Sequence, residues 1–175
     1  LMDSTGVAIY TWQSDYTPGN SVYLLENGNV LRTGGLRSGS FDAGGAGGIV
    51  QEIAPDSSVV WEFQYASSRV QQHHDIEQMP NGNILMIAWE SKTKVEAIAA
   101  GRDPNLLGDG ELWPDHVIEI DPASNEIVWE WHVWDHLIQD YDATKPNFGV
   151  IAEHPELIDL NHTNRQAGAD WNHVN

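Results

Sequence analysis

Short β-rich runs separated by turns cover most of the chain. One run, residues 22–25, leads through Glu26-Asn27-Gly28-Asn29 into a second run that starts at Val30. An Asn-Gly pair between two such runs is a strong hairpin signal, because both residues tolerate positive φ angles. The same phrase returns at residues 76–87, 54 residues after its first occurrence. The pattern therefore predicts two copies of one hairpin.

A second phrase also occurs twice and turns at a proline. Residues 49–63 and 117–131 both alternate, turn through Pro55 or Pro122, and leave on a Val-Trp-Glu strand. The two phrases thus follow each other in the order first, second, first, second. Two alternating hairpins per unit are typical of the four-stranded blades of a β-propeller, whereas a β-sandwich does not require duplicated phrases. We therefore predict an all-β fold, with two to three propeller blades in residues 1–175.

Insertions interrupt the repeats. Residues 91–114 contain the segment that favours a helix, Lys92–Ala100, and residues 135–166 predict a long rim loop. Residues 32–48 are rich in glycine but lack the spacing and the lysine of a phosphate-binding loop, so we interpret them as a connection. Because a propeller needs roughly four or more blades, we expect residues 1–175 to be a partial propeller domain, truncated at both ends.

The acidic composition of the chain argues against some classes of binding partner. The chain has 26 Asp and Glu against 8 Lys and Arg, a formal net charge of −18. Such a charge repels nucleic acids and anionic membranes, and the scattered acids favour a solvated surface over a patch for a cationic partner. The absence of cysteine excludes disulfides and thiolate chemistry, and no apolar run of about 18 residues predicts a membrane span.

Histidines are the most informative candidates for chemistry. The chain has eight, and the pair His73-His74 precedes Asp75 while His173 lies in the closing phrase Asp170–Asn175. We expect His74 and His173 to begin strands of successive blades and to face the central channel, where side chains of several blades converge on a ligand. The remaining isolated histidines are interpreted as hydrogen-bonded structural residues: His116, His154 and His162.

A further pair leaves two interpretations open. His132 and His136 are four positions apart with Asp135 between them, a spacing that suits a metal ion. The neighbouring tryptophans, Trp129, Trp131 and Trp134, instead predict a segment buried by packing.

Taken together, these phrases resemble a known family. His73-His74-Asp75-Ile76 with residues 79–85, the strand 127–132 and the closing phrase 170–175 look like the bacterial periplasmic arylsulfotransferases. The resemblance implies a six-bladed parent propeller, a periplasmic or extracellular location, and nucleotide-independent transfer of a sulfuryl group from a phenolic sulfate ester to another phenol through a histidine relay. It implies no cofactor, and its partners are a phenolic sulfate donor and a phenol acceptor.

The resemblance also assigns roles. It implies that His74 and His173 are catalytic residues of the channel, and that His73 and Asn175 bind sulfate oxygens. In the family, the histidine that carries the sulfuryl group and its partnering arginine lie downstream of the Asp-Trp-x-His segment, and Arg69 does not match that arginine. We therefore expect residues 1–175 alone to be inactive.

Without the resemblance, the residues are also compatible with two other functions. A propeller can be a non-catalytic binding module, because fold does not determine function. It can also be a metal-dependent hydrolase that uses His132 and His136. A homo-oligomer is compatible with each of these interpretations.

Overall fold

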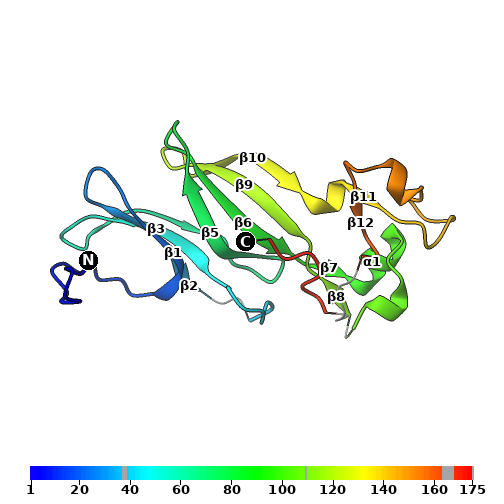
Figure 1. The fold of residues 1–175 in the computed structure, drawn as a ribbon, viewed down its shortest axis with the longest axis horizontal. Helices are drawn as coiled ribbons and strands as arrows, with labels where there is room; N and C mark the ends of the chain where they lie inside the picture. Colours follow the sequence, from blue (N-terminus) through cyan, green and yellow to red (C-terminus); the bar gives the residue numbers. More distant parts are fainter. Residues whose placement is uncertain (37–38, 109, 163–167, 175) are drawn as a thin grey trace.

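Two four-stranded antiparallel sheets form most of the molecule (Figure 1). The computed structural model describes residues 1–36, 39–108, 110–162 and 168–174. The strands of the first sheet follow chain order: β1 (Thr17–Leu24), β2 (Val30–Gly35), β3 (Gly48–Ile53) and β4 (Val59–Gln64). Those of the second do the same: β5 (Val70–Gln78), β6 (Ile84–Glu90), β9 (Asp115–Asp121) and β10 (Glu126–His132).

Each sheet contains one copy of both sequence phrases. The first phrase forms the hairpins β1–β2 and β5–β6, and the second forms β3–β4 and β9–β10. The prediction of repeated hairpins is confirmed, and the protein is mostly β with four-stranded antiparallel sheets. The glycine-rich connection is shorter than expected, because residues 32–35 continue β2.

The Asn-Gly turns are held by side chains as well as by backbone. In both, only the glycine has a positive φ, 84° at Gly28 and 90° at Gly82, although asparagine also tolerates such an angle. The asparagine instead accepts a hydrogen bond from the amide two residues later. The next asparagine donates to a glutamate of the following hairpin, Glu52 or Glu119, at 2.5 Å in each sheet. The two turns are therefore equivalent in structure as well as in sequence.

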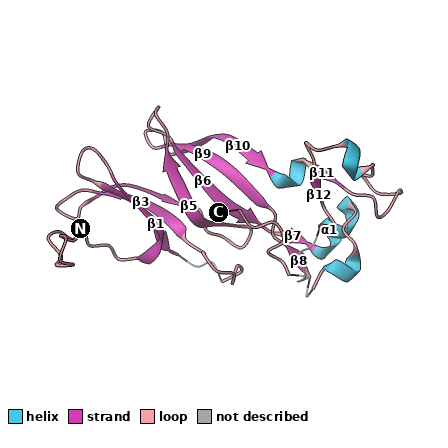
Figure 2. Ribbon diagram, in the orientation of Figure 1, coloured by secondary structure: helices cyan, strands magenta, loops and turns pink. Residues whose placement is uncertain are grey.

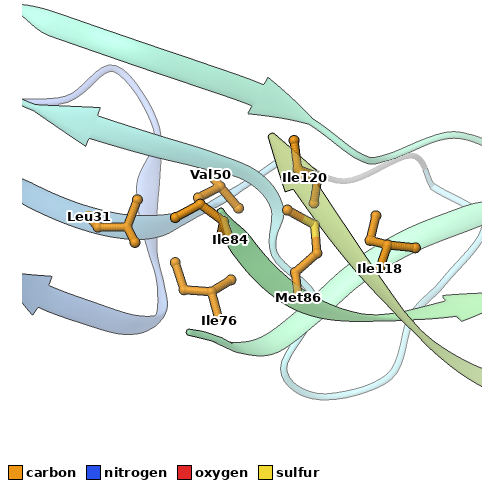
Figure 3. Packing of buried hydrophobic residues seen from close by; sticks show 7 residues of the cluster. All are labelled: Leu31, Val50, Ile76, Ile84, Met86, Ile118 and Ile120. Carbon is orange, nitrogen blue, oxygen red and sulfur yellow. The ribbon is translucent and has the colours of Figure 1, made fainter. Parts of the chain in front are cut away.

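The core lies between the two sheets (Figure 3). Leu31 and Val50 of the first sheet meet apolar side chains of the second sheet, and all of them are nearly inaccessible to solvent: Ile76, Ile84, Met86, Ile118 and Ile120. Two aromatic residues of β4 and the tyrosine that follows the strand stack in a row and pack against this core: Trp61, Phe63 and Tyr65. Burial of these alternating side chains stabilises the contact between the sheets.

The insertions form a third, separate region (Figure 2). Its helix α1 (Lys94–Ala100) starts two residues later than predicted, because Lys92–Thr93 forms β7 and Thr93 begins the helix with a capping box. Residues 135–166 are not only a loop, since they include β11 (Leu137–Ile138) and β12 (Ile158–Asp159), which pair in parallel. The region has its own apolar core around Ala97, Leu112 and Leu160. No described helix is long and apolar enough to cross a membrane.

Replacing Gly82 with alanine tests the turn geometry. A Cβ at this position meets no atom within 4 Å, so the cost comes from the backbone φ of 90° alone. We expect Gly82→Ala to lower the free energy of unfolding by about 1–2 kcal/mol. Gly82→Asn should cost less, because asparagine adopts the left-handed region more easily. Urea denaturation of the three proteins measures the difference, and equal stability of the Ala and Asn variants would contradict it.

Candidate functional site

A bulge in β5 directs two consecutive histidines into one site. In a regular strand, successive side chains point to opposite faces of the sheet. The register between β5 and β6 shifts between Gln72 and Ile76, and His74 has a φ of 46°. Such a backbone angle costs energy in a non-glycine residue and is most often retained at functional sites. As a result the rings of His73 and His74 lie edge to face, with centroids 5.5 Å apart.

The glycine-rich connection makes room for this bulge. The amide of His74 donates to the carbonyl of Gly45 at 2.9 Å, and Ala46 forms a bridge with His73. A Cβ on Gly45 would lie 2.3 Å from Nε2 of His74. Gly45 also has a φ of 85°. The connection is thus more than a linker, because it lets the backbone approach the histidine ring.

His173 completes a cluster of three imidazoles. Its ring centroid lies 4.6 Å from that of His74 and 5.2 Å from that of His73. One ring nitrogen of each residue lies within 4.8 Å of the others. His173 belongs to an irregular segment, and His74 lies inside β5, so the expectation that both begin strands is wrong. Asn175, predicted as a substrate-binding residue, lies outside the described residues.

Asp170 connects His173 to the second sheet. Its carboxylate lies 2.7 Å from Nδ1 of His173 and accepts a hydrogen bond from the indole of Trp89 at 3.1 Å. Nδ1 therefore carries a proton, and Nε2 is the nitrogen that has the lone pair when the ring is neutral. The buried ring of Trp89 also stacks on His73 at a centroid distance of 4.0 Å.

Asp115 connects His73 to the same irregular segment. Its carboxyl lies 3.3 Å from Nε2 of His73 and accepts a hydrogen bond from the amide of Val174, while its own amide donates to Asn172. Both side chains are almost completely buried. Burial lowers the pKa of His73 to about 3 and raises the pKa of Asp115 to about 7. Near neutral pH, His73 is therefore uncharged.

Asn20 of β1 orients the third imidazole. Its side-chain amide lies 3.0 Å from Nδ1 of His74, so the amide N–H donates and Nε2 of the neutral ring carries the proton. Burial and the neighbouring imidazoles of His173 and His73 lower the pKa of His74. The site thus draws on both sheets.

Sequence reasoning missed Asp115, Asn20 and Gly45. Asp115 opens the strand of the second phrase without any motif around it, and Asn20 is one of many asparagines. Asp170 belongs to the phrase that we singled out, but only the structure shows that its carboxylate orients His173. Asp115, Asn20 and Gly45 share one feature, which is that each contacts a histidine at least 29 positions away in the sequence.

The other histidines lie apart from this cluster. His132 stacks on His116 and contacts Glu90 at 3.1 Å, whereas both ring nitrogens of His136 are engaged, with Trp131 and with the carbonyl of His132. His132 and His136 are therefore not brought together on one ligand. The tryptophans predicted that this segment is buried by packing, and this prediction is correct only in part, because Trp129 is about half exposed.

The three histidines interpreted from the sequence as structural each take part in a hydrogen-bond contact outside the cluster. His116 is buried and lies 3.0 Å from the hydroxyl of Tyr65, and His154 pairs with Glu156. The carbonyl of His162 accepts a hydrogen bond from the indole of Trp171.

A hollow lies beside His173. It has a volume of about 540 Å³, and its walls include Leu157 and Ile158 of the insertion together with Trp171. Polar residues line it as well, among them Asp159, Asp170 and His173. This mixed lining suits a ligand with an aromatic part and a polar group.

The fold and the site define a mostly β protein with clustered imidazoles next to an aromatic-lined hollow. A family model described as Arylsulfotransferase (ASST) matches residues 1–175. The chain therefore belongs to the arylsulfotransferase family, and membership implies aryl sulfate sulfotransferase activity and aryl sulfate substrates. No curated protein and no solved structure matches the chain.

Asp115 makes a specific prediction about stability and pH. Its folded pKa is raised from 3.8 to about 7, so its contribution to stability is present below pH 4 and is lost as the pH rises to about 7. Asp115→Asn has no titrating carboxyl at this position, so the variant lacks this pH-dependent contribution to stability. The free energy of unfolding of the variant minus that of the wild type should therefore rise between pH 4 and 7, by at most about 1.4 kcal/mol per pH unit.

Urea denaturation across this pH range provides the measurement. Asp15→Asn, at an exposed position, is the matched control and should show a nearly constant difference from the wild type. A constant difference for Asp115→Asn as well would contradict the raised pKa.

Proposed function

We propose that this chain contributes the sulfuryl-binding part of an enzyme that transfers a sulfuryl group from a phenolic sulfate to another phenol without a nucleotide. In this proposal the two sheets are adjacent blades of a propeller, and the enzyme works in the periplasm or outside the cell. The observation that carries it is the convergence of His73, His74 and His173. Family membership supports the reaction class.

The cluster suits a sulfuryl group for a chemical reason. The group spreads negative charge over three oxygens, and N–H donors fixed in place stabilise that charge as it moves. His74 offers Nε2–H, since Asn20 occupies its other nitrogen. His173 offers Nε2, as a donor when the ring is protonated and as a base or nucleophile when it is neutral.

The proposed transfer has two balanced steps. A neutral histidine nitrogen attacks the sulfur of the donor, the N–S bond forms as the S–O bond to the first phenol breaks, and the leaving oxygen takes a proton from a neighbouring protonated imidazole. The second phenol then gives its proton back to that imidazole and attacks the sulfur, and the N–S bond breaks. By the family pattern, the histidine that carries the group belongs downstream of His173. His74 and His173 therefore act as the catalytic residues that hold sulfate oxygens, and the family pattern assigns the binding of further sulfate oxygens to His73 and Asn175.

The hollow beside His173 provides space for the aromatic part of the substrate. Its walls of Leu157, Ile158 and Trp171 can cover an aryl ring while the sulfate lies toward the cluster. The acceptor must reach the same sulfur, so donor and acceptor rings would occupy this space one after the other. The insertion would then influence which phenols are accepted.

The direct test is sulfuryl transfer by the full-length protein from a chromogenic aryl sulfate to phenol. We expect His74→Ala and His173→Ala to lower kcat/KM by at least about 100-fold, because each removes a contact to the transition-state charge. His132→Ala and added EDTA should leave transfer in place. Activity that is lost with EDTA or with His132→Ala would instead favour a metal-dependent enzyme, and a folded protein without transfer would favour a binding module.

Asp170→Asn tests whether the carboxylate positions His173. The amide can no longer accept the Nδ1 proton in the same way, so the ring is free to change tautomer. We expect kcat to fall by about 10- to 100-fold with a smaller change in KM, together with a shifted pH profile. The nitrogen chemical shifts of His173 report the tautomer directly. An unchanged tautomer and pH profile would show that Asp170 only supports the local structure.

A further inference from the structure

In each imidazole of the cluster, one ring nitrogen lies within hydrogen-bond distance of a residue outside the cluster. The other ring nitrogen has no such contact with the described residues. The engaged atoms are Nε2 of His73, Nδ1 of His74 and Nδ1 of His173, whose partners are Asp115, Asn20 and Asp170. In the described part of the chain, the opposite nitrogens of the three rings have no hydrogen-bond partner. That of His73, Nδ1, is buried as well, and an unpaired buried polar atom is costly.

This pattern is typical of histidines that bind a transition metal. Such a ligand is neutral, and its second nitrogen commonly donates to a carboxylate or another oxygen, which fixes the ring and increases its basicity. Two of the three histidines here have a carboxyl partner, Asp115 and Asp170. In His74, Asn20 donates to Nδ1 and Nε2 carries the proton, so this ring binds an ion only after the Asn20 amide turns and its oxygen accepts Nδ1–H.

The distances require only a local adjustment. With Zn–N bonds of about 2.0–2.1 Å, nitrogens in a tetrahedral site lie roughly 3.4 Å apart. One ring nitrogen of each histidine lies within 4.8 Å of one ring nitrogen of the other two, so the rings must move closer by about an ångström. His173 is the most exposed of the three and belongs to an irregular segment, so its ring can move inward while β5 holds the other two.

We infer that His73, His74 and His173 bind a divalent transition-metal ion such as Zn²⁺ or Co²⁺, and that this ion competes with aryl sulfate. The inference goes beyond the proposed function, because transfer itself requires no metal. The competition part rests on the proposed function, since it assumes that the same imidazoles bind the sulfate. The local carboxylates favour a cation at this position.

Co²⁺ titration of the full-length protein tests the metal site without any substrate. We expect one equivalent to bind with the strong visible absorption of four-coordinate Co²⁺, and Zn²⁺ to displace it. His173→Ala, at an exposed position, should weaken binding at least tenfold. His154→Ala removes a histidine that pairs with Glu156 outside the cluster, and it should bind like the wild type. Absence of the signal, or equal loss in both variants, would overturn the inference.

A transfer assay with added Zn²⁺ tests the competition separately. We expect inhibition that aryl sulfate relieves and that EDTA reverses. Cobalt binding without any transfer activity would leave the metal site standing and contradict the proposed function. Transfer activity without cobalt binding would support the proposed function and contradict the metal site. Inhibition by Zn²⁺ that aryl sulfate does not relieve would contradict a site shared by the ion and the substrate.

Discussion

The buried carboxyl of Asp115 is the contact on which the site depends. It holds the ring of His73 on one side and the backbone of Val174 on the other, so it joins β5 to a segment about one hundred positions further along the chain. Asp170 adds a second connection between the same segment and Trp89. A buried polar group is tolerated when its hydrogen bonds are satisfied, and such networks also specify one arrangement of the groups that they join.

The fold could be predicted from the sequence where its signals were local. The duplicated phrases contain their own turns and alternation, and each pair of phrases became one sheet. The details of the turns could not be predicted as well, since the Asn-Gly pairs use a longer turn in which only glycine has a positive φ. The helix begins two residues later than predicted, because the side chain of Thr93 caps the first turn and that of Lys92 cannot.

The site was predictable only in part. The closing phrase and the His73-His74 pair identified the imidazoles that meet, but sequence alone could not decide which of the two adjacent histidines would contribute. The bulge at His74 explains why both do. Asp115 reaches His73 only because β9 and β5 flank β6 in one sheet, and Asn20 reaches His74 only because the two sheets pack together, so no local pattern contains either partner.

The long separation of the site residues has a kinetic consequence. Each sheet is a meander of neighbouring strands, so its contacts close short loops and can form early. The hydrogen bonds that join residues 170–174 to Trp89 and Asp115 instead close loops of more than fifty residues. This segment can also open locally while both sheets stay intact. Amide hydrogen exchange would then be faster at Val174 than in β6 or β9, and the imidazole cluster would lose His173 well before the protein unfolds.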